Sequence, residues 1–335
     1  MENEEKIYYA TRNTQEIVTE EELKRLLEEK NEFHFYWGIA PTGSIHIGYF
    51  VPIMKIFDLL RAGGKGKILI ADYHGFLDDQ KTPWEQLRLR SKYYEVVLRS
   101  LLEYACKRYL PKIEFIRGSE FQTKKEYIED VFKLAVKVSI PRAMRAASSI
   151  VRRKDNPHVS ELLYPLMQIV DVKYMEAEVV VGGIDQRHVY MLGRENMDEI
   201  GGGKYVSIFT PLLKSLTNPK IKMSASIPES SISVVDNREK IREKILKAYC
   251  PERNSTENPV MDIVKYLLIP IFEKIEIETK SKGRVEYKEI RELERNFVEG
   301  KIHPFELKES VIEYLNKLLD PIRSSLQAKD YLNLA

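Results

Sequence analysis

The first two thirds of the chain alternate between short runs that are apolar at nearly every position and longer segments that are apolar on one side. The short runs are typical of strands buried on both faces of a sheet, and they cover residues 33–39, 67–72, 113–118 and 178–183. The longer segments have the helical period and lie near 46–63, 84–109, 124–138, 141–153, 160–176 and 185–196. This alternation predicts an α/β fold with a parallel sheet covered on both faces.

Capping residues support these boundaries. Thr19 and Glu22 have the spacing of a capping box, so a further helix is expected from about residue 20. Gly63 is suited to close one helix, and Pro83 is suited to open the next.

The character of the chain changes after residue 227, where clear strand signals are lost. Helices are expected near 237–249, 259–273, 286–298 and 304–328, with one weakly extended stretch at 274–287. A length of 335 residues suits two domains. We therefore expect an α/β domain over residues 1–227 and a mainly α-helical domain over residues 228–335.

Composition narrows the class of protein. Hydrophobic residues make up 43% and charged residues 31%, which is the balance of a folded globular chain and not of a disordered one. No apolar run approaches the roughly 18 residues that span a bilayer, so we expect no membrane segment. The start MENEEKIYYATRN does not resemble a secretory signal. Two distant cysteines, Cys106 and Cys250, cannot form a disulfide framework or a four-cysteine zinc site, and they favour a reducing compartment such as the cytoplasm.

The net charge of +2 hides one strongly basic stretch. From Lys137 to Lys154 there are six bases and no acid. The stretch can be a solvated helix face or a surface that binds phosphates, and composition does not separate the two. Pro141 can open a helix here, and Arg142 and Arg145 would then share one face.

The first candidate site follows the strand at 33–39. The segment Tyr36–Tyr49 reads YWGIAPTGSIHIGY, and it ends with His46 and Gly48 in the first turn of a helix. Helix N-termini bind anions through free N–H groups, and glycine allows a flat group to approach the backbone. The simpler interpretation is an ordinary turn with a surface histidine, and a lone HxG would favour it.

The second candidate is the pentapeptide KMSAS, Lys222–Ser226, in a polar stretch. A mobile loop with one lysine and two hydroxyl groups could close over a polyphosphate. Taken alone, the pentapeptide is a weak signal, and it favours a solvated loop.

The third candidate is a line of polar residues on a helix that is otherwise apolar. Tyr164, Gln168 and Asp171 are spaced to share one helix face, and apolar residues surround them. A buried carboxylate needs a partner, because leaving it unpaired is very costly. Either a structural network satisfies Asp171, or a ligand supplies the donor, such as a phenol hydroxyl or an ammonium group. Gln186 follows a predicted strand, at the sheet edge where α/β proteins bind ligands.

The order of these motifs resembles that of class I aminoacyl-tRNA synthetases, which carry HIGH-like and KMSKS-like signatures in a Rossmann-type domain. The resemblance is closer to the tyrosyl-tRNA synthetases of archaeal and eukaryotic type. It rests on YWG…TGSIHIGYF, ILIADYHGFLDD, LLYPLMQIVD, VGGIDQR, KMSAS, KAYCP and IHPFELKESV, in this order. It implies activation of L-tyrosine with ATP to tyrosyl-adenylate and pyrophosphate, followed by transfer of tyrosine to the 3′-terminal adenosine of tRNA(Tyr).

The resemblance also implies roles for residues at matching positions. Those expected at the tyrosine are Tyr36, His74, Tyr164, Gln168, Asp171 and Gln186. Those expected at the ATP are Gly38, His46, Gly48, Asp185 and Lys222. Those expected to assist catalysis are His46, Gly48, Lys222, Ser224 and Ser226. Those expected at the tRNA are Arg145 and Arg187 near the acceptor end and His303 and Glu306 near the anticodon.

Further expectations follow from the same resemblance. A helical insertion at about 118–158 would build a homodimer, and residues 228–335 would bind the anticodon. ATP would act as a substrate with Mg²⁺, and no structural metal is expected. The chain departs from the family pattern at three positions, which are Tyr49 in the HIGH-like motif, Ala225 in the KMSKS-like motif and Glu306 near the anticodon.

Three other functions compete with this one. A tryptophanyl enzyme shares the architecture, but its substrate needs a partner for an indole N–H. A general nucleotidyltransferase would lack both the polar line at 164–171 and the helical C-terminal domain. A non-catalytic relative that binds RNA or protein would be expected to lose the ATP motifs, and His46, Gly48, Asp185 and Lys222 are all present.

Overall fold

The computed structural model describes residues 2–148 and 156–327. Contacts between Cα atoms divide the chain into two compact units. The first comprises Met1–Thr42, Lys55–Leu98 and Cys106–Thr210, and the second comprises Gly43–Met54, Arg99–Ala105 and Pro211–Ala335. The division therefore assigns the HIGY turn and the KMSAS loop to the same unit.

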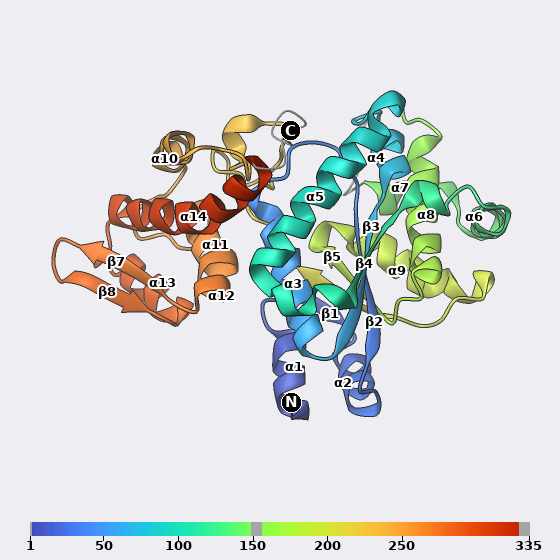
Figure 1. The fold of residues 1–335 in the computed structure, drawn as a ribbon, viewed down its shortest axis with the longest axis horizontal. Coiled ribbons are helices and arrows are strands. Elements are labelled where there is room, and N and C mark those ends of the chain that lie inside the picture. Colours follow the sequence, from blue (N-terminus) through green and yellow to red (C-terminus); the bar gives the residue numbers. More distant parts are fainter. Residues whose placement is uncertain (1, 149–155, 328–335) are drawn as a thin grey trace. The chain divides into compact units, whose positions relative to one another are not determined.

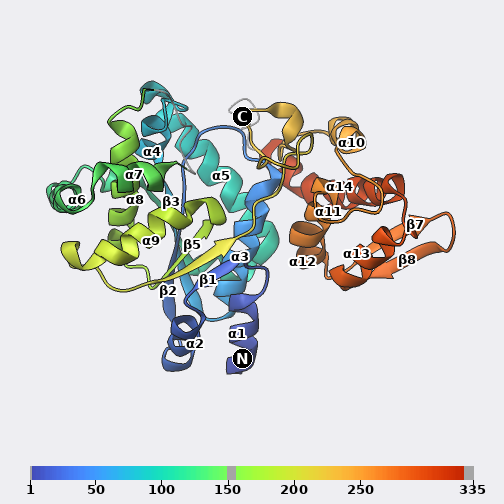
Figure 2. The same ribbon diagram turned by 180° about the vertical axis from the view of Figure 1, so that it is seen from behind.

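The first unit is built on a six-stranded sheet in the order β1-β6-β5-β2-β3-β4. Its strands are β1 (Glu16–Val18), β2 (Phe33–Ile39), β3 (Gly64–Ile70), β4 (Ile113–Arg117), β5 (Val179–Gly183) and β6 (Val206–Thr210). Strands β2 to β6 pair in parallel, while β1 pairs antiparallel with β6 (Figures 1 and 2). The chain winds outward from β2 to β4 and then in the other direction to β5 and β6. The carboxyl ends of β2 and β5 therefore flank a switch point, where such sheets bind ligands.

The four predicted strands are confirmed, and two further strands were not predicted. Buried valine and aromatic residues explain β2 and β5, because both faces of these strands are covered. Strand β3 begins three residues before the predicted start, at Gly64. The predicted parallel sheet is confirmed for β2 to β6. The added edge strand β1 pairs antiparallel with β6, and its three half-buried residues carry no apolar run that the sequence could reveal. Strand β6 is buried along its length but had not been recognised.

Most helices of the α/β part lie close to the predicted ranges, but the helices at Asn3–Thr11 and Asp72–Leu77 were not predicted. The described helices of this part are α1 (Asn3–Thr11), α2 (Glu20–Glu29), α3 (Phe50–Arg61), α4 (Asp72–Leu77), α5 (Leu87–Cys106), α6 (Lys125–Lys137), α7 (Ile140–Ala147), α8 (Ser160–Tyr174) and α9 (Arg187–Asn196). The Thr19 capping box is confirmed, and Gly63 has the positive φ expected after a helix. Helices α6 to α9 gather on one side of the sheet (Figure 1). The predicted end of the helix at 141–153 lies outside the described residues.

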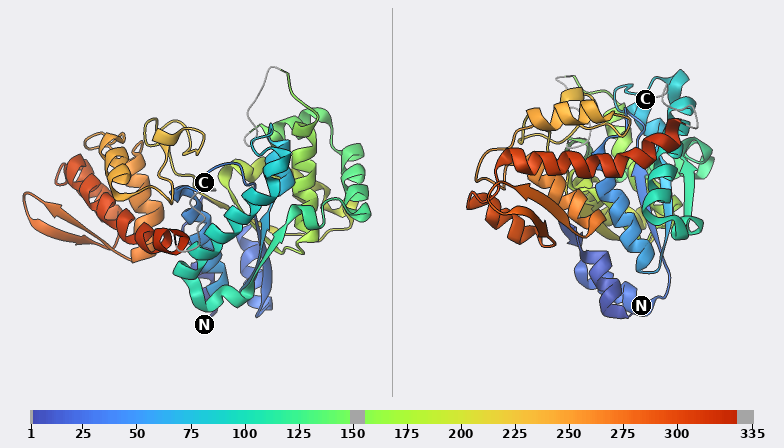
Figure 3. Two further views of the ribbon diagram at one scale, coloured as in Figure 1. Left: turned by 45° about the horizontal axis from the view of Figure 1, so that its top comes forward. Right: turned by 60° about the vertical axis from the view of Figure 1, so that its left-hand side comes forward.

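The C-terminal part of the second unit contains helices and one ribbon. The helices are α10 (Arg238–Lys247), α11 (Pro259–Ile263), α12 (Ile269–Phe272), α13 (Ile290–Val298) and α14 (Pro304–Gln327), with a π-helical turn at Val264–Leu268. The extended stretch is an antiparallel pair, β7 (Ile275–Thr279) and β8 (Gly283–Tyr287), packed beside α14 (Figure 3). Helix α13 starts later than the predicted residue 286, because β8 continues to Tyr287. Within the described ranges, we find no helix with the length and apolarity needed to cross a bilayer.

Candidate functional site

A line of polar residues on α8 is buried in the first unit. Tyr164, Gln168 and Asp171 are 7%, 8% and 1% exposed. They share a face because their spacing follows the helical repeat, as the sequence predicted. The structure thus places a carboxyl group among apolar residues, where its partners decide what it can do.

Asp171 is hydrogen-bonded through only one of its two oxygens. Gln122 Nε2 and Tyr127 OH each donate to Asp171 Oδ1 over 2.8 Å. Asp171 Oδ2 accepts no hydrogen bond from the described residues, and His74 Nε2 lies 3.8 Å from it. No lysine or arginine of the described part of the chain forms an ion pair with this carboxylate. One oxygen belongs to a structural network, and the other faces a position without a donor.

Burial controls the ionisation of this group of side chains. It raises the pKa of Asp171 to about 7, although the hydrogen bonds from Gln122 and Tyr127 act in the opposite direction. It lowers the pKa of His74 to about 4, so the imidazole is neutral near pH 7. The contact between His74 and Asp171 is therefore not an ion pair. A neutral hydrogen-bond donor would stabilise the carboxylate here at less desolvation cost than a second charge.

Four buried polar atoms of this region have no hydrogen-bond partner among the described residues. They are His74 Nε2, Gln122 Oε1, Gln168 Oε1 and Asp171 Oδ2. Buried polar atoms are nearly always bonded, so several unmatched atoms in one place indicate that a polar ligand completes the network. Of the two alternatives left open by the sequence, this geometry favours a ligand site over a closed structural network.

Two glutamines connect α8 to the carboxyl end of β5. Gln168 Nε2 donates to Gln186 Oε1 over 3.0 Å, and Gln186 ends the short turn Ile184–Gln186 that follows β5. Asp185 lies in the same turn and is half-buried. The structure thus brings the predicted Gln186 to the predicted line on α8, at the sheet edge expected for a ligand.

Tyr36 belongs to the same region and depends on a glycine. Its side chain is 1% exposed, and burial, with Tyr190 and Asp171 as further causes, raises the pKa of Tyr36. Gly38 lies two positions later on β2, and a Cβ atom there would overlap the Tyr36 phenol. Gly38 therefore has a steric reason that is independent of any nucleotide.

His46 lies in the second unit and caps the turn Ile47–Tyr49 that leads into α3. Its Nδ1 accepts from the Gly48 N–H over 3.1 Å. Burial, with Lys222 as the second cause, lowers the pKa of His46 to about 4. The ring is thus neutral near pH 7, and because Nδ1 accepts, the proton is on Nε2. Nε2 is a donor.

The HIGY turn and the KMSAS loop lie against each other within the second unit. A Cβ atom built on Gly43 would lie 3.1 Å from Ala225 Cβ. The Ile47 N–H donates to the carbonyl of Ile232 over 2.9 Å, which ties the turn to the segment after the loop. Ser224 Oγ and Ser226 Oγ are 2.9 Å apart. The two motifs, distant in sequence, thus form one local structure.

The basic residues expected at RNA differ in how far they are already engaged. Arg145 is exposed on α7, whose opposite face is buried. Arg142 pairs with Glu195 on α9. Arg187 makes two hydrogen bonds to Glu16, of 2.6 and 2.8 Å, and Glu16 raises the pKa of Arg187. The last three bases of the stretch, Arg152, Arg153 and Lys154, lie outside the described residues.

His303 lies just before helix α14, and Glu306 lies in its first turn. His303 Nδ1 accepts from the Phe305 N–H over 3.1 Å. The Glu306 carboxylate accepts from the His303 N–H over 2.8 Å and from the Lys280 N–H over 2.9 Å. This arrangement closes the helix start and fixes the turn between β7 and β8. The two residues therefore have a structural role, whatever else they bind.

Gln122 and Tyr127 bind Asp171 but were not among the predicted site residues. Gln122 follows β4 after a short helical turn, Gly118–Glu120, much as Gln186 follows β5 at the end of the turn Ile184–Gln186. That position was a usable signal. Tyr127 lies in the first turns of α6, and nothing in the spacing connects it with Asp171.

Comparisons with known proteins find the same family that the sequence motifs resemble. The family model described as tRNA synthetases class I (W and Y) matches residues 28–320. The tyrosine–tRNA ligase of Haloarcula marismortui is 39% identical over 338 residues, covering 99% of this chain and 96% of that one. The cytoplasmic tyrosine–tRNA ligase of Danio rerio is also 39% identical, and the match covers 99% of this chain and 62% of that protein. The crystal structure of tyrosyl-tRNA synthetase with L-tyrosine from Archaeoglobus fulgidus superposes with a TM-score of 0.89, at 40% identity and with 97% and 100% of the two chains covered.

Proposed function

The chain belongs to the class I tRNA synthetases of the tryptophan and tyrosine type and acts as a tyrosine–tRNA ligase, and we propose that the buried carboxylate of Asp171 selects its substrate. The enzyme activates L-tyrosine with ATP to tyrosyl-adenylate and pyrophosphate. It then transfers tyrosine to the 3′-terminal adenosine of tRNA(Tyr). The observation that carries the proposal is Asp171 Oδ2, a buried acceptor with no hydrogen-bond donor among the described residues.

The phenol hydroxyl of tyrosine donates to Asp171 Oδ2, and Tyr36 contacts the same hydroxyl. Phenylalanine would leave the buried Asp171 Oδ2 without a donor. Sites that bond a substrate hydroxyl reject the analogue without it by roughly 10⁴–10⁵, and a tyrosyl-tRNA synthetase is itself the reference case for that range. Gln122 and Tyr127 orient the carboxylate by occupying its other oxygen.

The amino group of tyrosine requires acceptors, and the polar line on α8 supplies them. Gln168 Oε1 is a buried acceptor without a partner among the described residues, and Tyr164 and Gln186 lie on the same polar path. We assign these three residues to the ammonium group and the backbone atoms of the substrate. His74 packs edge-on against Tyr164, with ring centroids 4.6 Å apart, and shapes the wall beside them.

ATP is assigned to the two motifs. His46 Nε2 donates to a phosphate oxygen as a neutral group, and the Gly48 turn lets the phosphates approach the backbone. Lys222, Ser224 and Ser226 neutralise and bind the phosphates that leave as pyrophosphate. Gly38 and Asp185 are assigned to the adenosine, with Asp185 near the ribose.

Mg²⁺ would be held by the phosphate oxygens of ATP rather than by protein side chains. The described residues contain no group of three or more histidine, cysteine, aspartate or glutamate side chains that could hold a metal themselves. When bound with ATP, Mg²⁺ offsets phosphate charge. No protein nucleophile is needed, because the tyrosine carboxylate attacks the α-phosphorus and pyrophosphate leaves. The ribose 2′-hydroxyl of the tRNA end then attacks the carbonyl carbon of tyrosyl-adenylate, the bond from that carbon to the phosphate oxygen breaks, and AMP leaves as the hydroxyl proton is released.

The tRNA is assigned to surfaces of both parts. The acceptor end meets the basic stretch at 137–154 through Arg145, with Arg187 nearby in the same unit. The helical region 228–335 reads the anticodon, and His303 and Glu306 lie at the start of its longest described helix. Both assignments rest on matching positions in the family.

The functional assembly is a homodimer formed through the insertion at 118–158. Its support is an apolar surface on α6 and α7, where Phe132, Val136 and Ile140 are 64%, 85% and 67% exposed. Phe132 and Val136 are one helical turn apart, so they form one patch that a second copy would cover. The chain works in the cytoplasm, in keeping with its two distant cysteines and with its relative named as cytoplasmic.

ATP–pyrophosphate exchange, measured with each of the twenty amino acids in turn, tests the proposal. We expect exchange with tyrosine and roughly 10⁴-fold or more weaker exchange with phenylalanine. Exchange stimulated by tryptophan would favour the tryptophanyl alternative. No exchange with any amino acid would favour the non-catalytic alternative.

A further inference from the structure

The lysine of the KMSAS loop lies directly opposite a second lysine. Lys214 and Lys222 form an antiparallel bridge, with the Ser215 N–H donating to the Ile221 carbonyl over 2.9 Å and the Met223 N–H to the Leu213 carbonyl over 2.8 Å. In a pair flanked in this way the two Cα atoms are about 4.5 Å apart and the side chains share a face. Like charges in directly opposite positions destabilise the pairing. The pairing is therefore stabilised if another group of the protein neutralises the charge of Lys214.

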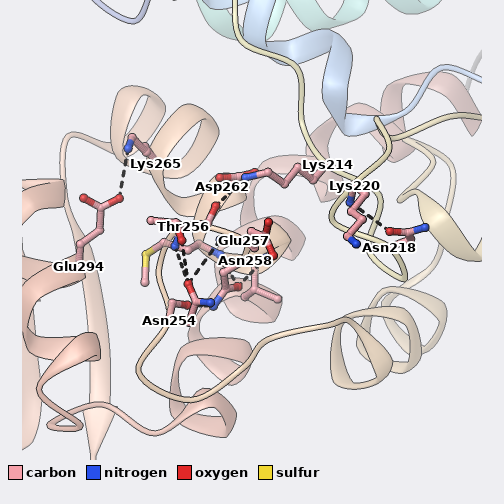
Figure 4. Close-up of polar contacts among 12 residues, drawn as sticks. Lys214, Asn218, Lys220, Asn254, Thr256, Glu257, Asn258, Asp262, Lys265 and Glu294 are labelled. Carbon is pink, nitrogen blue, oxygen red and sulfur yellow. Dashed lines mark hydrogen bonds and ion pairs between the residues drawn. The ribbon is translucent and has the colours of Figure 1, made fainter.

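The ammonium group of Lys214 is bound by Asp262 and by a backbone carbonyl. Lys214 Nζ lies 3.0 Å from Asp262 Oδ2 and 2.8 Å from the carbonyl oxygen of Thr256 (Figure 4). The side chain of Asp262 is 7% exposed, so the pair is screened far less than one on the surface. Lys214 and Lys222 lie on the two sides of one hairpin, which we call the KMSAS hairpin. The ion pair attaches this hairpin, through Lys214, to helix α11.

The receiving side is held rigidly. Asn258 is fully buried, and its Oδ1 accepts from the Val260 and Met261 N–H groups over 3.1 Å each. Its Nδ2 donates to the Asn254 carbonyl over 3.0 Å, and Asn254 Oδ1 accepts from the Thr256 N–H over 3.0 Å. These bonds fix the start of α11 and the loop before it, which together present the carboxylate and the carbonyl to one ammonium group (Figure 4).

We propose that Asp262 is a positioning residue for adenylate formation, which holds the KMSAS hairpin by its Lys214 side chain so that Lys222 meets the phosphates of ATP. The inference rests on the proposed function of Lys222. Asp262 touches no substrate in this account. It neutralises the charge opposite Lys222 and ties the hairpin to a rigid helix, so that less ordering remains to be done when ATP binds.

The test is steady-state ATP–pyrophosphate exchange with Asp262→Asn, which keeps the shape and removes the charge. The expected result is a fall in kcat of about tenfold or more with the KM for tyrosine unchanged within about twofold, because the interaction supports only the phosphate step. The matched control is Glu294→Gln, which removes the 3.2 Å pair of Lys265 with Glu294 next to the same helix and leaves the hairpin alone. Equal kcat values in the two variants would overturn the proposal.

A second measurement does not depend on catalysis. Trypsin cleavage after Lys220 and Lys222, both exposed, reports how firmly the hairpin is held. Asp262→Asn should be cut faster than the wild type and Glu294→Gln at the wild-type rate, while Lys214→Arg, which keeps the cation, should retain protection. Unchanged cleavage in Asp262→Asn would contradict the tether. If the wild-type protein shows no tyrosine-dependent exchange, the proposed function fails, and the cleavage rates still decide the tether.

Discussion

Asp171 Oδ2 and His74 Nε2 face each other across 3.8 Å, both buried and neither hydrogen-bonded to a described residue. Because burial keeps His74 neutral near pH 7, the carboxylate receives no balancing charge from it. A hydroxyl donor placed against Asp171 Oδ2 would relieve that cost. The free-energy cost of burying this carboxylate is therefore offset when a substrate brings a hydroxyl donor, and this favours such a substrate over one without it.

The raised pKa of Asp171 predicts a pH-dependent cost in stability. Its pKa rises from 3.8 to about 7 on folding, so the native state holds the proton more tightly than the unfolded chain, and stability falls as pH rises from about 4 to 7. Asp171→Asn removes this titration. Denaturant unfolding at pH 5 and pH 8 should show the variant gaining on the wild type by on the order of 1–3 kcal/mol at the higher pH. A difference that does not change with pH would contradict the raised pKa.

His46 is expected to act on phosphate as a neutral donor. His46→Ala should lower the rate of adenylate formation by roughly 10²–10³, the usual cost of losing one such donor, and change tyrosine affinity little. His46→Gln, which offers an amide donor, should recover part of the rate. Rapid-quench measurement of the first turnover separates the two quantities. Lost affinity with a normal rate would mean that His46 serves the amino acid and not the phosphates.

Substitution can separate the structural role of Glu306 from its proposed contact with the anticodon. Glu306→Ala should cost about 1 kcal/mol of stability, because it removes the acceptor for the His303 and Lys280 N–H groups. Glu306→Gln keeps an acceptor and removes the charge. Tyrosine activation should persist in both variants, while tRNA charging weakens. Parallel loss of activation and charging would point to a stability effect without anticodon contact.

The exposed patch on α6 predicts the oligomeric state. Val136→Glu places a charge in the centre of the surface that a second copy would cover, so sedimentation velocity should show a shift from dimer towards monomer. Leu89→Glu, at another exposed apolar position of the same unit, is the control and should leave the dimer intact. A wild-type monomer, or a dimer unaffected by Val136→Glu, would show that this patch is not the interface.

How far the sequence could predict this fold depends on how local the signal was. The strands at 33–39 and 178–183 were identifiable because burial on both faces leaves a continuous apolar run. Strand β1 has three half-buried residues, so its place is decided by pairing with β6 and not by its own pattern. Helix α1 was missed as well, because its only buried residue is Ala10 and no apolar stripe marks it.

In the candidate site, too, features local to one helix could be predicted from the sequence, whereas tertiary contacts could not. The line on α8 could be predicted because three positions of one helix carried it. The partners of Asp171 could not, because Gln122 and Tyr127 meet it only through tertiary contacts between separate segments. Likewise, spacing alone did not reveal that Lys214 lies opposite Lys222 or that Asp262 binds it.

We expect Asp171 to distinguish tyrosine from phenylalanine. The most direct test of this expectation is the ratio of kcat/KM for tyrosine to kcat/KM for phenylalanine in ATP–pyrophosphate exchange, compared between the wild type and Asp171→Ala with folding checked by circular dichroism. The ratio should be on the order of 10⁴–10⁵ in the wild type and fall by at least about 10²-fold in the variant, mostly through loss of tyrosine activation. A folded Asp171→Ala protein that keeps the wild-type ratio would contradict the account.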